Sequence, residues 1–137
     1  DDETSRGLGD VYKRQIVMLL CMYRATNKEG TMLTKELHNT AMVAAQKATE
    51  DHLNTHGEAD ACGFAWVTAY VNGASKLGKS FKAQGFDKAY GGGWQLWNPS
   101  KSYTQSISAK ERGAQAYVDV IRTALPTVKI YASSRMD

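Results

Sequence analysis

Two histidines and one cysteine lie close together in the sequence and could ligate a metal. His52 and His56 are four residues apart, which places both imidazoles on one face of a helix, and Cys62 follows soon after. A zinc-protease helix with this histidine spacing also needs a glutamate directly after the first histidine, where this chain has Leu53. A structural metal would need a fourth ligand, and the sequence shows none. We therefore expect an exposed helix end and no metal.

The segment around Cys62 is weakly similar to the nucleophile region of papain-like proteases, in which Cys-Gly is followed two residues later by the reactive cysteine. Ala65 occupies the position of that cysteine, and no histidine follows residue 56 to act as the base. The sequence therefore favours a buried thiol at the start of a strand. A small enzyme with a pocket near Cys62 and Arg135 stays open as a third interpretation, and no cofactor is expected.

The middle of the chain combines positive charge with aromatic rings. Residues 75–112 contain seven basic and two acidic residues, whereas residues 35–60 contain two basic and five acidic residues. Cations that follow phosphates and rings that stack on bases are the usual means of binding single-stranded nucleic acid. The alternative is an ordinary core beside a solvated helix face. The candidate nucleic-acid-binding residues are Lys76, Lys79, Lys82, Lys88, Tyr90, Trp94, Trp97 and Lys101.

The helices that must hold these residues follow from hydrophobic periodicity. Residues 35–56 place their apolar positions on one helical face, with Thr34 as the N-cap and Gly57 as the stop. A second long helix is expected after Ser108 and Glu111, which have the spacing of a capping box.

Runs of alternating or continuous apolar residues predict strands at residues 62–71, 94–97 and 128–132, with a short further strand at 104–107 left open. In residues 62–71 both alternating faces are apolar, which predicts a central strand covered on both sides. Ser75 and Gly85 bound a short helix after this strand. Together these elements predict an α+β fold in a single domain. It would have one small sheet of three to four strands packed against two longer helices and one short helix.

The first 31 residues look foreign to this domain. Ser5–Gln15 resembles the translation of a sequencing adapter, and Lys28–Met32 is compatible with a ribosome-binding site followed by a start codon. We therefore expect residues 1–31 to be a non-native, disordered leader and residues 32–137 to form the domain. The longest apolar run, residues 16–22, is shorter than the roughly 20 residues that cross a membrane. Two cysteines give no disulfide framework, which favours a reducing, intracellular setting.

Several short motifs resemble a family of small uncharacterised proteins from tailed bacteriophages. They are Cys62–Val67, Gly93-Trp94, Trp97-Asn98-Pro99, Gln105, Gly113-Ala114 and the closing Ser134-Arg135-x-Asp137. The resemblance implies an accessory protein in the host bacterial cytoplasm and supplies no specific activity. With it, the sequence favours a non-enzymatic binding module for single-stranded DNA or RNA. A modulator that binds a host protein is the alternative, and no membrane partner is expected.

Overall fold

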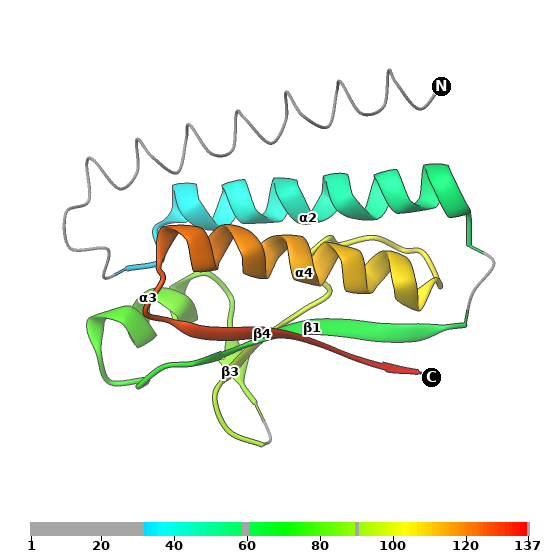
Figure 1. Cartoon of the computed structure of the whole chain (residues 1–137). Helices are drawn as coiled ribbons and strands as arrows, with labels where there is room; N and C mark the ends of the chain where they lie inside the picture. The colour runs from blue at the N-terminus through cyan, green and yellow to red at the C-terminus, as the bar shows by residue number, and fades with distance from the viewer. Residues whose placement is uncertain (1–31, 59–60, 90, 137) are drawn as a thin grey trace.

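A computed structural model describes residues 32–58, 61–89 and 91–136 (Figure 1). In chain order the elements are α2 (Lys35–His56), β1 (Gly63–Tyr70), α3 (Lys76–Ala83), β2 (Asp87–Lys88), β3 (Trp94–Trp97), α4 (Ile107–Ala124) and β4 (Lys129–Met136). The four strands form one antiparallel sheet in the order β2-β3-β1-β4. This confirms the predicted α+β class, with one small sheet, two longer helices and one short helix.

From β1 onward the elements follow the order strand, helix, strand, strand, helix, strand, which is the split βαβ or ferredoxin-like order. Helix α2 is an addition before it. The leader expected at residues 1–31 lies outside the described residues, so that expectation stays a prediction. No helix within the described ranges has the length and apolar character needed to cross a bilayer.

Local capping sets the helix boundaries that the sequence predicted. The Thr34 hydroxyl accepts a hydrogen bond from the Leu37 N–H (3.2 Å) at the start of α2. At the other end Gly57 has a φ of 69°, and its N–H donates to the Leu53 carbonyl at 2.8 Å. The Ser75 side chain caps α3 in the same way as Thr34 caps α2.

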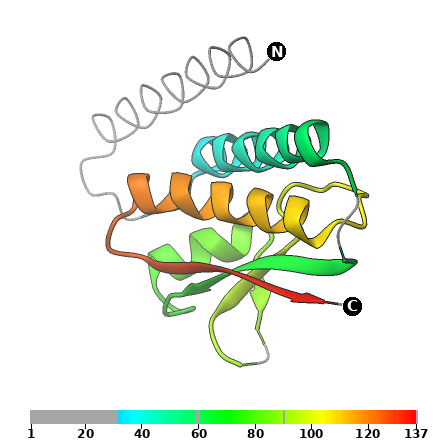
Figure 2. The same cartoon turned by 45° about the vertical axis from the view of Figure 1, so that its right-hand side comes forward.

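Both long helices lie on the same side of the sheet (Figures 1 and 2). Helix α4 lies against β1 and β4, and α2 packs along α4. Small side chains bring the two helices close, because Ala41 and Ala45 of α2 are fully buried. A methyl group added at Gly113 of α4 would lie 3.1 Å from the Ala45 carbonyl oxygen. The shallow, alanine-rich face of α2 is thus the surface that accepts α4.

Strand β1 alternates small and large side chains. Ala65, Val67 and Ala69 point toward the helices and are buried in the core. The alternate positions include Phe64 and Tyr70, which are exposed. The prediction that this strand is covered on both sides is therefore wrong. The described helices cover one face of the sheet and leave the other open (Figure 2).

The start of α4 also differs from the prediction. The N-cap is Ser106 and not Ser108, so the helix begins two residues earlier than the capping box suggested. Glu111 does not close such a box, and its carboxylate accepts a hydrogen bond from the Ser134 hydroxyl at 2.6 Å. Residues 104–107 form no strand and contribute only an isolated bridge at Ser106.

A hydrogen-bonded pair of rings joins α2 to the buried side of α4. The Tyr117 ring is fully buried, and its hydroxyl lies 2.7 Å from Nδ1 of His38. Burial raises the pKa of Tyr117, so the phenol stays protonated. Burial, and secondly the charge of Lys101, lower the pKa of His38. The pair is therefore neutral at physiological pH.

Candidate nucleic-acid interface

The sheet face opposite the helices carries side chains from every strand. Residues paired in an antiparallel sheet share a face, so the register identifies this surface without further assumption. We call it the open face. Its members are Phe64, Trp66, Thr68, Tyr70, Asp87, Gln95, Trp97, Lys129, Tyr131, Ser133 and Arg135.

Three rings form a cluster at one end of the open face. Trp66 and Trp97 are paired across β1 and β3, and their ring centres lie 4.9 Å apart with a tilt of 37°. Phe64 meets Trp97 edge to face at 6.3 Å. Phe64 is 38% exposed and Trp97 is 47% exposed, so both rings present surface to solvent. Contiguous exposed apolar surface is a common feature of interaction sites.

A second aromatic group lies further along β1. The ring centres of Tyr70 and Tyr131 are 6.1 Å apart, and about half of each side chain is exposed, 53% and 46%. Along the strand, Tyr70 lies roughly 20 Å from Phe64, at about 3.4 Å per residue. Thr68 and Gln95 are opposite each other in the register, in the same row as Tyr131. Thr68 is buried and Gln95 is partly exposed, so the open face carries exposed rings toward both ends and one accessible amide near its middle.

Cations surround the first aromatic cluster. The Lys110 ammonium lies 5.3 Å from the centre of the Phe64 ring and also donates to the Gly63 carbonyl at 2.9 Å. The Arg135 guanidinium lies 5.9 Å from the same ring, from the neighbouring strand. Both distances are within the range of cation–π attraction. Positive charge is thus held beside the rings at this end.

The second aromatic group also has cations beside it. The Arg122 guanidinium lies 5.0 Å from the Tyr131 ring, and two of its nitrogens donate to the Ile130 carbonyl at 2.7 and 3.0 Å. Lys129 is paired with Tyr70 in the register and is exposed. The acidic residue that the register adds to the open face is Asp87, on β2. Around the rings, positive charge exceeds negative charge.

The predicted tryptophans lie on opposite faces of the sheet. Trp97 belongs to the open face, whereas Trp94 pairs with the buried Ala69 and packs against the core. The Lys82 ammonium of α3 lies 4.6 Å from the centre of the Trp94 ring, so this cation and this ring contact each other on the helix side of the sheet. Lys88 shares the face of Trp94, because the two are paired in the register.

The other predicted lysines are also away from the open face. Lys76 and Lys79 are exposed on α3, and Lys101 lies near His38 on the helix side. Tyr90 lies outside the described residues. Of the predicted set that the structure describes, only Trp97 is on the open face. The alternation of large and small residues in 63–70 was the signal that could have identified the members of this face on β1.

The chemical sites considered from the sequence do not assemble with the open face. The ring centres of His52 and His56 lie 4.7 Å apart, and no group of three metal-ligating side chains forms among the described residues. Cys62 is exposed, so the prediction of a buried thiol is wrong. An open pocket of about 570 Å³ lies beside β4, and neither Cys62 nor Arg135 lines it. Its lining residues are His52, Ser108, Glu111, Arg112, Gln115 and Ala132–Ser134.

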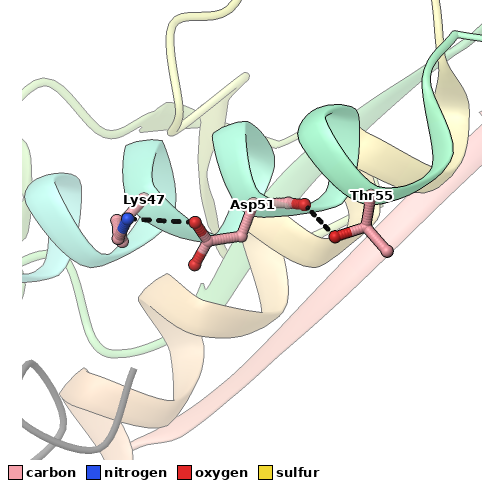
Figure 3. Close-up of polar contacts among 3 residues, drawn as sticks. All are labelled: Lys47, Asp51 and Thr55. Carbon is pink, nitrogen blue, oxygen red and sulfur yellow. Dashed lines mark hydrogen bonds and ion pairs between the residues drawn. The ribbon is translucent and has the colours of Figure 1, made fainter. Parts of the chain in front are cut away.

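The described acidic residues near the end of α2 lie on a solvated surface. Figure 3 shows Lys47 and Asp51 one turn apart, joined by an ion pair of 3.0 Å. The Thr55 hydroxyl donates to the Asp51 carbonyl at 2.8 Å. Glu50 and Glu58 are exposed. An exposed pair of this kind contributes only a few tenths of a kcal/mol.

No family model, curated protein or solved structure matches this chain.

Proposed function

We propose that the protein is a non-enzymatic binding module for single-stranded DNA or RNA, and that the open face is the binding surface. The observation that supports this most directly is the exposure of aromatic rings on one sheet face with lysine and arginine beside them. Four-stranded sheets whose exposed aromatic rings stack on two or three bases are an established means of recognising single strands.

The geometry suggests how a strand would lie. Bases would stack on Phe64 and Trp97 at one end and on the Tyr70–Tyr131 pair at the other, since any base presents a π face. Phosphates would run past Arg135 and Lys129, which are located at the two ends of β4. Gln95, which is partly exposed, would face the bases between Trp97 and Tyr70.

The biological setting is part of the same proposal. The motifs from Cys62 to Val67 and at Trp97-Asn98-Pro99 resemble tailed-phage accessory proteins, which would place the chain in the cytoplasm of a bacterial host. Single-stranded intermediates of phage replication and transcription are available there. The resemblance supports the setting, and the open face supports the ligand.

A titration of the full chain with fluorescent single-stranded DNA and RNA tests the proposal. Anisotropy would be measured with oligonucleotides of about 16 nucleotides at several salt concentrations. We expect binding that weakens as salt rises. Trp97→Ala and Phe64→Ala should each lower the affinity roughly 5- to 150-fold, because a stacked base contributes about 1–3 kcal/mol and 1.4 kcal/mol is tenfold.

The chain offers two matched controls. Trp94→Ala removes the same ring type three residues away, on the opposite face, and should leave affinity unchanged when the folded fraction is accounted for. Lys129→Glu with Arg135→Glu should reduce both affinity and its salt dependence, whereas Lys76→Glu with Lys79→Glu makes the same charge change on α3. Equal losses from the two charge reversals would show that the open face is not the phosphate path.

Binding of a host protein is the alternative function for the same surface. Exposed rings such as Tyr70 and Trp97 also serve protein recognition. If no oligonucleotide binds even at low salt, the nucleic-acid proposal is wrong. Capture of a lysate protein by the wild type, but not by Trp97→Ala, at a level independent of salt would then favour the alternative.

A further inference from the structure

Strand β4 ends the sheet and presents an open edge. The order β2-β3-β1-β4 gives it one neighbour, and no strand lies beyond it in the ranges that the structure describes (Figures 1 and 2). A strand edge of eight residues is a template for further pairing unless charges, proline, a bulge or a covering element block it. Its middle residues, Ala132–Ser134, carry none of these.

Hydrogen bonds at the Ala65 and Ile130 carbonyls show which backbone groups point outward from β4. The Asn98 N–H donates to the Ala65 carbonyl (3.0 Å), so the backbone N–H and C=O groups of Ala65 point toward β3 and those of Phe64, Trp66 and Thr68 point toward β4. The residues paired with these on β4 are odd-numbered, and their backbone groups point toward β1. The backbone groups of the even-numbered residues of β4 must therefore point away from β1. The Arg122 guanidinium donates to the Ile130 carbonyl from outside, which agrees with this parity.

Arg122 thus binds the outward carbonyl of Ile130, and the backbone groups open to a further strand begin at Ala132. The N–H and C=O groups of Ala132 and Ser134 both point outward along the same uncharged stretch. The open pocket of about 570 Å³ lies on the helix side of this stretch, so the described helices leave the edge accessible. The occupant must therefore supply an extended backbone opposite Ala132–Ser134.

We infer that a second copy of this chain pairs with β4, antiparallel, with Ser133 on the twofold axis. In this register Ala132 of each copy is opposite Ser134 of the other, which forms four backbone hydrogen bonds. Tyr131 of each copy then lies opposite Arg135 of the other, which repeats across the interface the ring–guanidinium contact that Arg122 already makes with Tyr131.

The neighbouring registers are less favourable. An axis at Ala132 puts Lys129 opposite Arg135, and like charges directly opposite destabilise a strand pair. It also depends on Ile130, whose carbonyl Arg122 already binds. An axis at Ser134 moves Arg135 opposite Ser133 and separates it from Tyr131. Only the axis at Ser133 combines free backbone groups with complementary side chains.

The dimer has a consequence for the open face. A twofold axis perpendicular to the sheet places the open faces of both copies on the same side and both helix layers on the other. Residues Lys129–Arg135 of the two copies would then join two open faces into one surface. The inference itself rests on the backbone geometry and side-chain pairing of β4 and is independent of any nucleic-acid ligand.

Sedimentation of the full chain without nucleic acid tests the pairing. The contact is small, so we expect a weak dimer whose apparent mass rises from one chain toward two with concentration. Ala132→Pro removes an outward N–H that β1 does not use and should keep the protein monomeric. A wild type that is monomeric at every concentration, or an Ala132→Pro protein that still dimerises, would refute the inference.

Cysteine cross-linking tests the register and does not depend on the proline variant. In a background with Cys21→Ser and Cys62→Ser, Ser133→Cys places two thiols across the axis, at a Cβ separation of about 4.5–5.5 Å. We expect a disulfide-linked dimer on mild oxidation. Tyr131→Cys is the matched control and should not cross-link, because its counterpart is Arg135. A disulfide-linked dimer of the Tyr131→Cys protein, or of a Ser134→Cys protein, without one of the Ser133→Cys protein would refute the register.

Discussion

Replacing Gly113 with alanine probes the contact between the two long helices. The added methyl group would strike the Thr49 hydroxyl and lie 2.9 Å from Cβ of Ser100 and 3.1 Å from the Ala45 carbonyl oxygen. One of these neighbours is backbone and cannot rotate away. Thr49 is 2% exposed, and its hydroxyl donates to the Ala109 carbonyl at 2.8 Å. The methyl group must therefore separate the helices or displace that hydroxyl.

The magnitude follows from three opposing effects. Alanine in place of glycine within a helix gains about 1 kcal/mol. Overpacking a tight core contact costs about 1–3 kcal/mol. A displaced Thr49 hydroxyl, buried without its partner, costs about 1–3 kcal/mol more. We therefore expect Gly113→Ala to lower the free energy of unfolding by about 1–5 kcal/mol.

Urea unfolding of the full chain, followed by circular dichroism, measures this change. Arg112→Ala is the control, because this neighbouring side chain is exposed and such substitutions usually change stability by less than about 0.5 kcal/mol. Thr49→Ala removes the atom that the new methyl group strikes, so the double variant should lose less than the sum of the two single losses. A Gly113→Ala protein as stable as the wild type would show that α2 and α4 are not in this close contact.

Two further predictions concern the interior. Because the folded pKa of His38 lies below its unfolded value of 6.5, the unfolded chain binds more protons as the pH falls through that window. Stability should be greatest above pH 6.5 and decline toward lower pH, and His38→Gln should reduce this decline; unchanged pH profiles would contradict the buried pair with Tyr117. Phe81→Ala should lower the free energy of unfolding by about 3–5 kcal/mol, since this ring is fully buried and its centre lies 4.9 Å from that of Phe86. Phe64→Ala, on the open face, should lower the free energy of unfolding far less. A larger loss from Phe64→Ala than from Phe81→Ala would contradict the assignment of the core to the helix side of β1.

The elements were predictable because short-range patterns determine them. The stripe of apolar residues and the caps at Thr34 and Gly57 defined α2. The start of α4 was misplaced because Ser106 and Ser108 are both competent caps. The choice between them depends on the burial of Ser106, which is a tertiary property. Sequence spacing alone does not contain that information.

The candidate site was predicted less well, because its residues come together through strand register. Trp94 and Trp97 are three residues apart on a strand, and that spacing places them on opposite faces. Treating the basic residues of the middle segment as one surface ignored this alternation. Arg135 and Tyr131 come from β4, more than 60 residues after Phe64, and only the sheet brings them beside it. The proposed ligand type rests on composition, whereas the surface depends on the strand register.

The division of β1 into small buried and large exposed residues separates folding from binding. Ala65, Val67 and Ala69 complete the core with the helices, so the fold does not need large rings on the opposite face. Phe64 and Tyr70 leave substantial apolar surface in water, where a polar β-former such as threonine would serve the strand equally well. The proposed single-stranded ligand would account for their presence beside arginine and lysine, because it would cover them. Substitutions on this face should accordingly change binding before they change stability.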